Sequence, residues 1–275
     1  MNILDLIFPN NLYCVSCSRP LPQSGNIAFC ESCASEIPWI TGKCCAICGR
    51  PLAAENPKEL CRDCGASGER KFRKGYACAL YMGPVAELVR NMKYKNRSWY
   101  ADTFAASMAA RYLAETDPET GELPCHDYLI SVPMSERKKS VRGFNQAALL
   151  AKGLSGRIGT HYLKDALKRV RETDVMSSLS ADERRQNLAN AFIVPCNARD
   201  FLAGSRLLLV DDVYTTGSTA DACAEVLLAA GAESVDIFVF AIGADVRREE
   251  NRPLTWSLTP HSPATAFRRI VGTYI

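Results

Sequence analysis

The sequence lacks an apolar run long enough to span a membrane, which takes ~20 residues. The longest candidate, residues 235–244, contains Asp236. The first residues carry Asp5 and no basic segment, so no secretory signal is predicted. An excess of one charge is also missing, because 33 basic and 30 acidic residues leave a net charge of +3, which excludes a polybasic coat for nucleic acid. We therefore expect a soluble cytoplasmic protein.

Histidine is scarce as well. None of His126, His161 and His261 has the partner spacing of a metal site or a catalytic pair, so we expect structural or solvent-facing roles for them. Apolar residues are abundant, at 47% of the 275 residues, so the chain can bury a core. Its length predicts one large domain or two unequal ones.

Cysteine is unusually frequent, and nine of the 13 cysteines lie within the first 64 residues. In a chain without an export signal, dense cysteines predict metal ligands before disulfides. Eight of them form a repeat. The pattern C-x2-C-x12-C-x2-C occurs twice, 31 residues apart, at Cys14, Cys17, Cys30 and Cys33 and at Cys45, Cys48, Cys61 and Cys64. The remaining five we expect to be small buried apolar residues, namely Cys44, Cys78, Cys125, Cys196 and Cys223.

Four thiolates in two tight turns are typical of a closed, tetrahedral zinc site that serves structure. Each copy is too small for its own core, so metal binding has to supply much of its folding energy. We predict two structural zinc ions. Disulfides and a redox C-x-x-C pair are the alternatives, although a redox pair does not require four cysteines. The two copies could also exchange ligands, but the repeat fits better with one site in each copy, formed by its own four cysteines.

The organisation predicted along the chain is a cysteine-rich zinc-binding module over residues 1–68, an α/β domain over 76–246 and a C-terminal extension over 247–275 with no assigned role. A small polar linker is expected near 65–71. Strands alternating with helices predict a mainly parallel, doubly wound sheet. The expected strands are 128–132, 207–210 and 235–240; the expected helices are 84–92, 98–115, 145–154, 218–230 and a short one opened by a capping box at 180–183.

Residues 207–219 carry the most informative motif. An apolar strand is expected to end in Asp211 and Asp212, followed by a turn of small hydroxyl residues and Gly217 that opens a helix. Open α/β sheets bind ligands at this edge, and the free N–H groups of such a turn can surround a phosphate. The two acids would repel a phosphate and instead suit the vicinal hydroxyls of a sugar.

This motif resembles the phosphoribosyl-diphosphate (PRPP) signature of type I phosphoribosyltransferases. The resemblance implies that Asp211 and Asp212 bind the ribose hydroxyls and stabilise positive charge developing at the anomeric carbon. It implies Mg²⁺ held through diphosphate and ribose oxygens. It also implies a 5′-phosphate cradle made of Thr215, Thr216, Gly217, Ser218 and Thr219.

Further segments resemble the ComF family, in which a phosphoribosyltransferase-like domain follows an N-terminal double zinc-ribbon module. They are Ile-Ser-Val-Pro-Met at 130–134, Arg-Gly-Phe-Asn-Gln at 142–146, Lys-Tyr at 93–94, and Glu-Arg with Asn at 183–187 before Ala-Phe at 191–192. The resemblance implies a role in DNA uptake during natural competence, beside a helicase-like partner. The sequence differs from the usual family pattern at two places. Residues 130–134, in the candidate diphosphate loop, replace Val-Pro-Val-Pro-Leu, and Met176, on the acceptor side, stands where Gln is usual.

Several further residues are candidates for binding PRPP. The turn ending in Pro133 is a candidate diphosphate loop, and Arg137, Lys138 and Arg142 could neutralise diphosphate, although a solvated basic loop explains them equally well. Arg184 lies where related enzymes carry a mobile hood, with an ordinary surface arginine as the alternative. Lys93 is a further candidate, with a structural role as the alternative.

Single-stranded DNA is a further candidate ligand. Residues 70–76 and 93–100 interleave cations with aromatics, as single-strand binders do. Three hypotheses follow: a phosphoribosyltransferase with an unknown acceptor, a PRPP-binding fold that handles single-stranded DNA, and an adaptor whose zinc module docks a motor protein. The acceptor pocket is built from variable parts of the fold and cannot be inferred from the motif.

Overall fold

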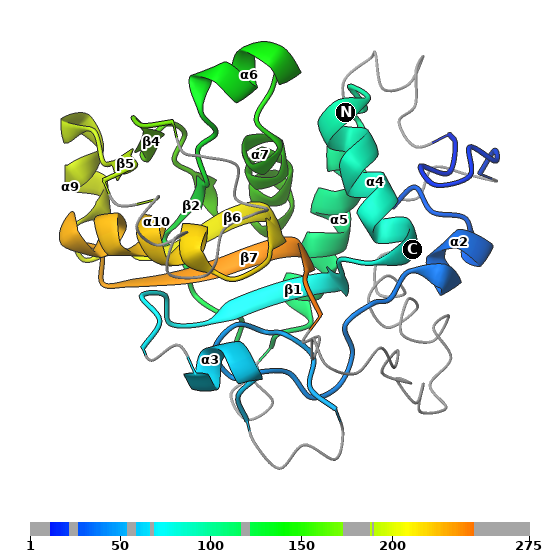
Figure 1. The fold of residues 1–275 in the computed structure, drawn as a ribbon, viewed down its shortest axis with the longest axis horizontal. Coiled ribbons are helices and arrows are strands. Elements are labelled where there is room, and N and C mark those ends of the chain that lie inside the picture. Colours follow the sequence, from blue (N-terminus) through cyan, green and yellow to red (C-terminus); the bar gives the residue numbers. More distant parts are fainter. Residues whose placement is uncertain are drawn as a thin grey trace.

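The computed structural model describes residues 12–21, 27–53, 59–66, 69–116, 122–172, 188 and 190–244. A five-stranded sheet forms the centre, with strand order β1-β7-β6-β2-β3 and every neighbouring pair parallel (Figure 1). This confirms the predicted doubly wound α/β fold. The strands are β1 (Gly75–Leu80), β2 (Tyr128–Ser131), β3 (His161–Tyr162), β6 (Arg206–Tyr214) and β7 (Ser234–Ile242).

Helices cover both faces of the sheet. Alternate residues of β6 point to opposite sides, so Leu208 and Val210 pack against one helical layer while Leu207 and Leu209 pack against the other. The first layer contains α4 (Gly83–Tyr94), α5 (Tyr100–Leu113) and α7 (Gln146–Ile158), and the second contains α10 (Ser218–Ala229). The smaller elements are α2 (Glu31–Glu36), α3 (Arg62–Ala66), α6 (Glu136–Arg142), β4 (Lys168–Arg169), β5 (Phe192–Ile193), η2 (Cys196–Ala198) and α9 (Arg199–Leu202).

The helix boundaries follow from local sequence signals. Pro84 lies in the first turn of α4, where its missing N–H costs nothing. Asn145 caps α7 by accepting a hydrogen bond from the Ala147 amide at 3.1 Å, and Gly159 ends that helix in the left-handed conformation. No helix among the described residues is long and apolar enough to cross a membrane.

The two cysteine-rich copies lie on opposite sides of the β1 edge. Trp39 forms an antiparallel bridge with Ala79, and the Ile40 amide donates to the Cys78 carbonyl at 2.8 Å, so the segment between the copies covers this sheet edge. The first copy packs with α4 and α5, and the second packs on the face of α10. In Figure 1 the first copy lies beside α4 with α2, and the second lies below β1 with α3.

Several expectations differ from the structure. Strand β6 does not end at Val210 but continues to Tyr214, because its pairing with β7 continues that far. The expected linker near 65–71 includes Arg70, whose side chain is only 5% exposed. Two of the five remaining cysteines, Cys125 and Cys196, are exposed rather than buried, whereas Cys78 and Cys223 are buried as predicted and Cys44 is half-buried.

The histidine prediction is confirmed where the structure describes it. His126 is buried, with Nδ1 2.9 Å from the Tyr112 hydroxyl and Nε2 3.0 Å from the Asp236 carboxylate, and His161 is exposed. The expected helix at 180–183, Met176, Arg184, His261 and the extension 247–275 lie outside the described residues.

Candidate functional site

The eight repeat cysteines form two separate clusters, one from each copy. In each cluster the four Sγ atoms lie within 4.8 Å of one another. Cys17 and Cys30 Sγ are 3.7 Å apart, and Cys48 and Cys61 Sγ are 3.6 Å apart. A tetrahedron with Zn–S bonds of about 2.3 Å has edges of about 3.8 Å. The donor sets therefore fit zinc, and each copy supplies all four ligands of its own site.

The repeat extends to individual hydrogen bonds. The Cys14 amide donates to the Arg19 carbonyl at 2.8 Å, and 31 positions later the Cys45 amide donates to the Arg50 carbonyl at 2.7 Å. Ser18 and Gly49 both have positive φ, at 60° and 72°. Cys45 is thus the ligand in register. The thiol of its neighbour Cys44 instead faces the Gly42 carbonyl at 3.4 Å.

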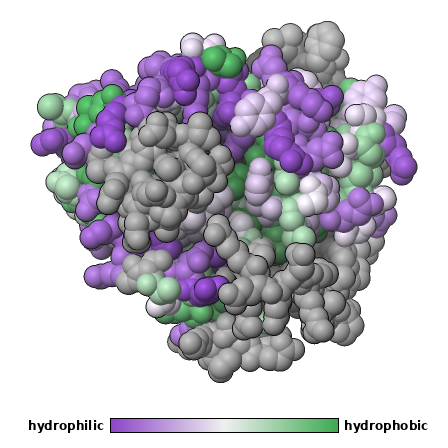
Figure 2. Space-filling view, viewed as in Figure 1, coloured by the Kyte–Doolittle hydropathy of each residue, from purple (hydrophilic) through white to green (hydrophobic). Residues whose placement is uncertain are grey.

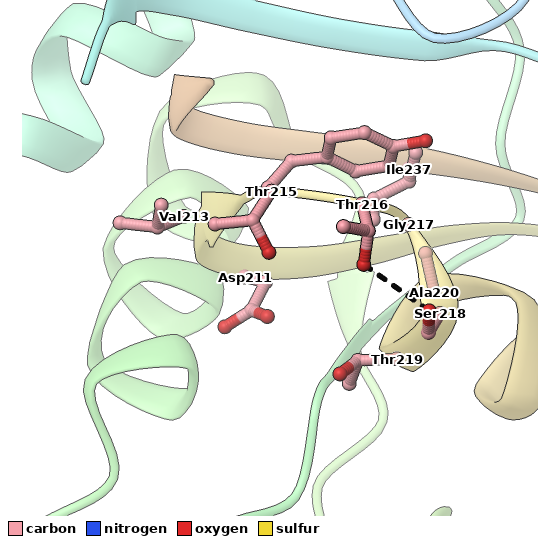
Figure 3. Close-up of a pocket in the computed structure, with 10 residues that line it drawn as sticks. Asp211, Val213, Thr215, Thr216, Gly217, Ser218, Thr219, Ala220 and Ile237 are labelled. Atoms are coloured by element: carbon pink, nitrogen blue, oxygen red, sulfur yellow. Dashed lines mark hydrogen bonds between the residues drawn. The ribbon is translucent and has the colours of Figure 1, made fainter. Parts of the chain in front are cut away.

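The motif at 207–219 borders a cavity of about 270 Å³ at the carboxyl end of β6. Figure 3 shows the Asp211 carboxylate and the hydroxyl groups of Thr215, Thr216 and Thr219 around the same space. The Thr216 and Ser218 hydroxyl oxygens are 3.1 Å apart. The cavity is lined by Asp211, Val213, Tyr214, Thr215, Thr216, Gly217, Ser218, Thr219, Ala220 and Ile237.

Gly217 shapes the loop where it enters α10. Its φ is 85°, and a Cβ there would lie 2.3 Å from the Tyr214 hydroxyl, so only glycine fits both the conformation and the space. Glycine at the N-cap also has no side chain with which to cap the first turn of α10. The N–H groups of that turn are therefore suited to an anion, which the helix dipole favours at this end.

Asp211 and Asp212 point to opposite faces of β6. Asp211 is partly buried and lines the cavity, and it accepts a hydrogen bond from the Asp212 amide at 2.8 Å. Asp212 is buried toward α4, where the Lys93 ammonium lies 2.8 Å from its carboxylate. The structure thus brings Asp211 together with the loop and places Asp212 in an ion pair behind it.

These three groups influence one another's charge. Burial and the neighbouring Asp212 carboxylate raise the pKa of Asp211 from 3.8 to about 7, against the opposing effect of Lys93. Burial lowers the pKa of the Lys93 ammonium, but the carboxylates of Asp212 and Asp211 outweigh it and the net shift is upward. Lys93 therefore remains charged, whereas Asp211 changes charge near neutral pH.

The candidate diphosphate residues follow the neighbouring strand, β2. The Val132 amide donates to the Val210 carbonyl at 2.9 Å, so the turn containing Pro133 starts beside the part of β6 that precedes Asp211. The basic segment after it is a helix, α6, capped by the Ser135 side chain and ended by Gly143 with φ 82°. Hydrophilic residues gather over this part of the molecule, at the top of Figure 2.

The α6 cations differ in their surroundings. Arg137 is 72% exposed and lies 3.8 Å from Glu172. Arg142 donates to Gln146 at 2.8 Å, and its guanidinium lies 5.2 Å from the centre of the Tyr94 ring, at the end of α4. Burial and the nearby cations, Arg169 first among them, lower the pKa of Lys138. Positive charge thus gathers at α6, as both a diphosphate site and a solvated basic helix require, and Glu172 and Glu136 lie beside Arg137 and Lys139.

Two arginines, one in the second cysteine-rich copy and one in the segment that follows it, contact the loop and the start of α10, and neither contact was predicted. Arg50 donates to the Thr215 carbonyl at 2.7 Å, and Arg70 donates to Asp221, in the first turn of α10, at 2.8 Å. The repeat did not indicate the Arg50 contact, because the first copy has an arginine at the matching position, Arg19, and that arginine is exposed in the structure. The one difference in the local sequence of the two copies that could have indicated a closer approach is Gly49, which stands where the first copy has Ser18.

The two segments with interleaved cations and aromatics are not equivalent. In residues 70–76, Phe72 and Tyr76 are 2% and 4% exposed and cannot stack on bases. In residues 93–100, Tyr94 and Trp99 are 75% and 60% exposed. Only the second segment can offer rings to a single strand.

Comparison with known proteins agrees with both halves of the structure. A model of the double zinc ribbon domain matches residues 3–65, and a model of the phosphoribosyl transferase domain matches residues 141–268. Competence protein F of Haemophilus influenzae is 32% identical over 232 residues, which cover 84% of this chain and 97% of that protein. Competence protein ComFC of Bacillus subtilis is 28% identical over 76% of this chain and 82% of its own length.

Among solved structures, glutamine PRPP amidotransferase from B. subtilis is similar over 62% of this chain and 35% of its own. The TM-score is 0.32 and the identity 18%, a similarity too low to indicate function.

Proposed function

The chain belongs to the competence protein F family, and on that premise we propose that it binds PRPP with Mg²⁺ at the loop 215–219 and acts in DNA uptake during natural transformation. The observation that carries the proposal is the placement of the Asp211 carboxylate and the loop hydroxyls around one cavity. A carboxylate suits ribose hydroxyls, and the uncapped start of α10 suits the 5′-phosphate.

The remaining groups are assigned by charge. The diphosphate would lie toward the Pro133 turn and α6, where Arg137 and Arg142 supply cations, and Arg184 would join them. Mg²⁺ would bind mainly through ligand oxygens and water, as is usual for this ion. Among the described residues near the cavity, Asp211 is the carboxylate that could approach Mg²⁺, because the Asp212 carboxylate is paired with Lys93. Asp212 and Lys93 would set the local charge from behind the strand.

The test is calorimetric titration and thermal unfolding with PRPP and Mg²⁺. Wild type should bind and gain stability through linkage, by roughly 2–3 kcal/mol at 100-fold excess over the dissociation constant. Asp211→Asn should lose this gain, and Asp200→Asn, which removes an exposed carboxylate on α9, should keep it. Absence of any gain in the wild type contradicts PRPP binding.

Catalysis is a separate question from binding. If the chain transfers phosphoribose, PRPP should be consumed and diphosphate released when a panel of bases and nucleic acids is offered as acceptor. Consumption with one acceptor class identifies an enzyme, whereas tight binding without consumption across the panel identifies a PRPP-binding module.

A second candidate function, binding of single-stranded DNA, is favoured by the exposed rings of Tyr94 and Trp99. Arg142 lies over the first ring, and the Arg97 guanidinium lies 5.8 Å from the centre of the second. Rings and cations side by side allow base stacking together with phosphate contact.

Fluorescence anisotropy with a labelled single strand tests this function. A stacked base is worth about 1–3 kcal/mol, so Tyr94→Ala should weaken binding roughly 5- to 150-fold. Phe201→Ala removes a ring that is 50% exposed on α9 and should leave binding unchanged. Equal affinity of wild type and Tyr94→Ala at about 200 mM salt would rule out stacking at this surface.

A further inference from the structure

We infer that the second cysteine-rich copy, here called the second zinc ribbon (residues 45–64), positions the phosphate loop (residues 215–219) through Arg50. The second zinc site would then support ligand binding at this loop, and the first zinc site would not. The inference rests on the proposed function for the identity of the ligand. The contact that carries it does not depend on that ligand.

Arg50 connects three parts of the molecule. Its backbone carbonyl belongs to the Cys45–Cys48 turn, where it accepts from the Cys45 amide. Its guanidinium donates to Asp63 at 2.6 Å, between the ligands Cys61 and Cys64, and to the Thr215 carbonyl at 2.7 Å. One side chain, 3% exposed, thus joins both halves of the zinc site to the loop.

The contact with Thr215 controls how the loop presents its donors. In a trans peptide the carbonyl and the following N–H point in opposite directions. A carbonyl of Thr215 held toward the zinc ribbon therefore turns the N–H of Thr216 away from the ribbon. Without the guanidinium the Thr215 carbonyl would lose its charged partner, and the peptide would be freer to rotate.

Neighbouring contacts keep the ribbon close to the loop. The Gly75 amide donates to the Ile47 carbonyl at 2.6 Å, and a Cβ on Gly49 would lie 2.3 Å from the Gly75 carbonyl oxygen. The ring of Phe72 packs edge-on against Tyr214, at 6.1 Å between ring centres. Close backbone approach explains why the second copy has glycine where the first has Ser18.

The first copy provides an internal control. Arg19 occupies the corresponding position with the same backbone hydrogen bond, yet it is exposed. Its ribbon packs on the other side of the sheet, where the Ala28 amide meets the Thr103 hydroxyl at 3.3 Å. The two copies thus share the turn and its hydrogen bond, and only the second has an arginine side chain that contacts the loop.

The experiment compares Arg50→Met with Arg19→Met. Both keep all eight thiols, so both should retain the zinc content of the wild type. The Asp221 amide donates to the Gly217 carbonyl at 2.8 Å and the Gly243 amide to the Tyr214 carbonyl at 2.9 Å, so these two amides report on the two ends of the loop. Their hydrogen exchange should accelerate about tenfold or more in Arg50→Met, the scale of losing one charge-assisted hydrogen bond, and stay unchanged in Arg19→Met. Arg50→Lys should be intermediate, because one ammonium cannot span both acceptors.

Binding supplies the second measurement. The dissociation constant for PRPP with Mg²⁺ should rise about tenfold or more in Arg50→Met and not in Arg19→Met. Exchange and affinity that remain unchanged in Arg50→Met, or that change equally in Arg19→Met, would overturn the inference. If the wild type does not bind PRPP, the proposed function fails, and the exchange measurement still decides whether the second ribbon positions the loop.

Discussion

Replacing Gly217 with alanine tests how tightly the phosphate loop is packed. The new Cβ would lie 2.3 Å from the Tyr214 hydroxyl and 2.8 Å from an Arg70 nitrogen, and both side chains are buried. Holding alanine in the left-handed conformation costs about 1–2 kcal/mol. Forcing a methyl group into a filled space costs about 1–3 kcal/mol more.

Gly204→Ala separates these two costs. Gly204 has a similar φ of 68°, but no atom of the described residues lies within 4 Å of the position of an added Cβ. Only the conformational cost of about 1–2 kcal/mol applies there. Because 1 kcal/mol shifts the unfolding temperature by about 2–4 °C in chains of this size, Gly217→Ala should unfold roughly 2–12 °C below Gly204→Ala.

Tyr214→Phe checks the cause. The Tyr214 hydroxyl has no hydrogen-bond partner in the part of the chain that the structure describes, so removing it should cost little by itself. In the Gly217→Ala background it should restore part of the lost stability, because it removes the nearest clashing atom. Equal unfolding temperatures for Gly217→Ala and Gly204→Ala, measured by differential scanning calorimetry at constant zinc, would refute the close packing.

Three further predictions concern charge and metal. The pKa of Asp211, raised to about 7, means that folding disfavours the ionised form of this carboxyl. Between about pH 5 and pH 8 the wild type should therefore lose roughly 1–3 kcal/mol of unfolding free energy relative to Asp211→Asn, measured by urea unfolding. A difference in unfolding free energy that does not change with pH would contradict the raised pKa. Lys93→Met leaves the Asp212 carboxylate without its partner and should cost about 1–3 kcal/mol, less than a fully buried pair because Lys93 is 21% exposed. Adding Asp212→Asn should recover most of that loss, and no recovery would show that Lys93 acts otherwise. A thiol-modifying reagent should release about two zinc ions per chain in two phases. The first ion should come from the site that contains exposed Cys17, and the second from the site whose four cysteines are buried. Release in one phase would argue against a difference in accessibility between the two sites.

Features with local signals could be predicted from the amino-acid sequence alone. Zinc coordination needs four cysteines at short spacing, and the two exact repeats located both clusters, including the choice of Cys45 over Cys44. The strand, turn and helix around Gly217 follow from an apolar run and a residue that tolerates positive φ. Periodic apolar residues likewise located α4, α5 and α7 to within a few residues of their ends.

Contacts between distant segments could not be predicted in this way, because they depend on how the whole chain folds. Strand alternation sends Asp211 into the cavity and Asp212 to Lys93, more than 100 positions earlier in the chain, so adjacent acids acquire different surroundings. Arg50 and Arg19 both follow a C-x2-C turn and precede Pro-Leu, yet the copies pack on opposite sides of β1, so Arg50 contacts the loop and Arg19 is exposed. Long-range contacts of this kind leave no periodic trace in the sequence, because each depends on the path of the whole chain.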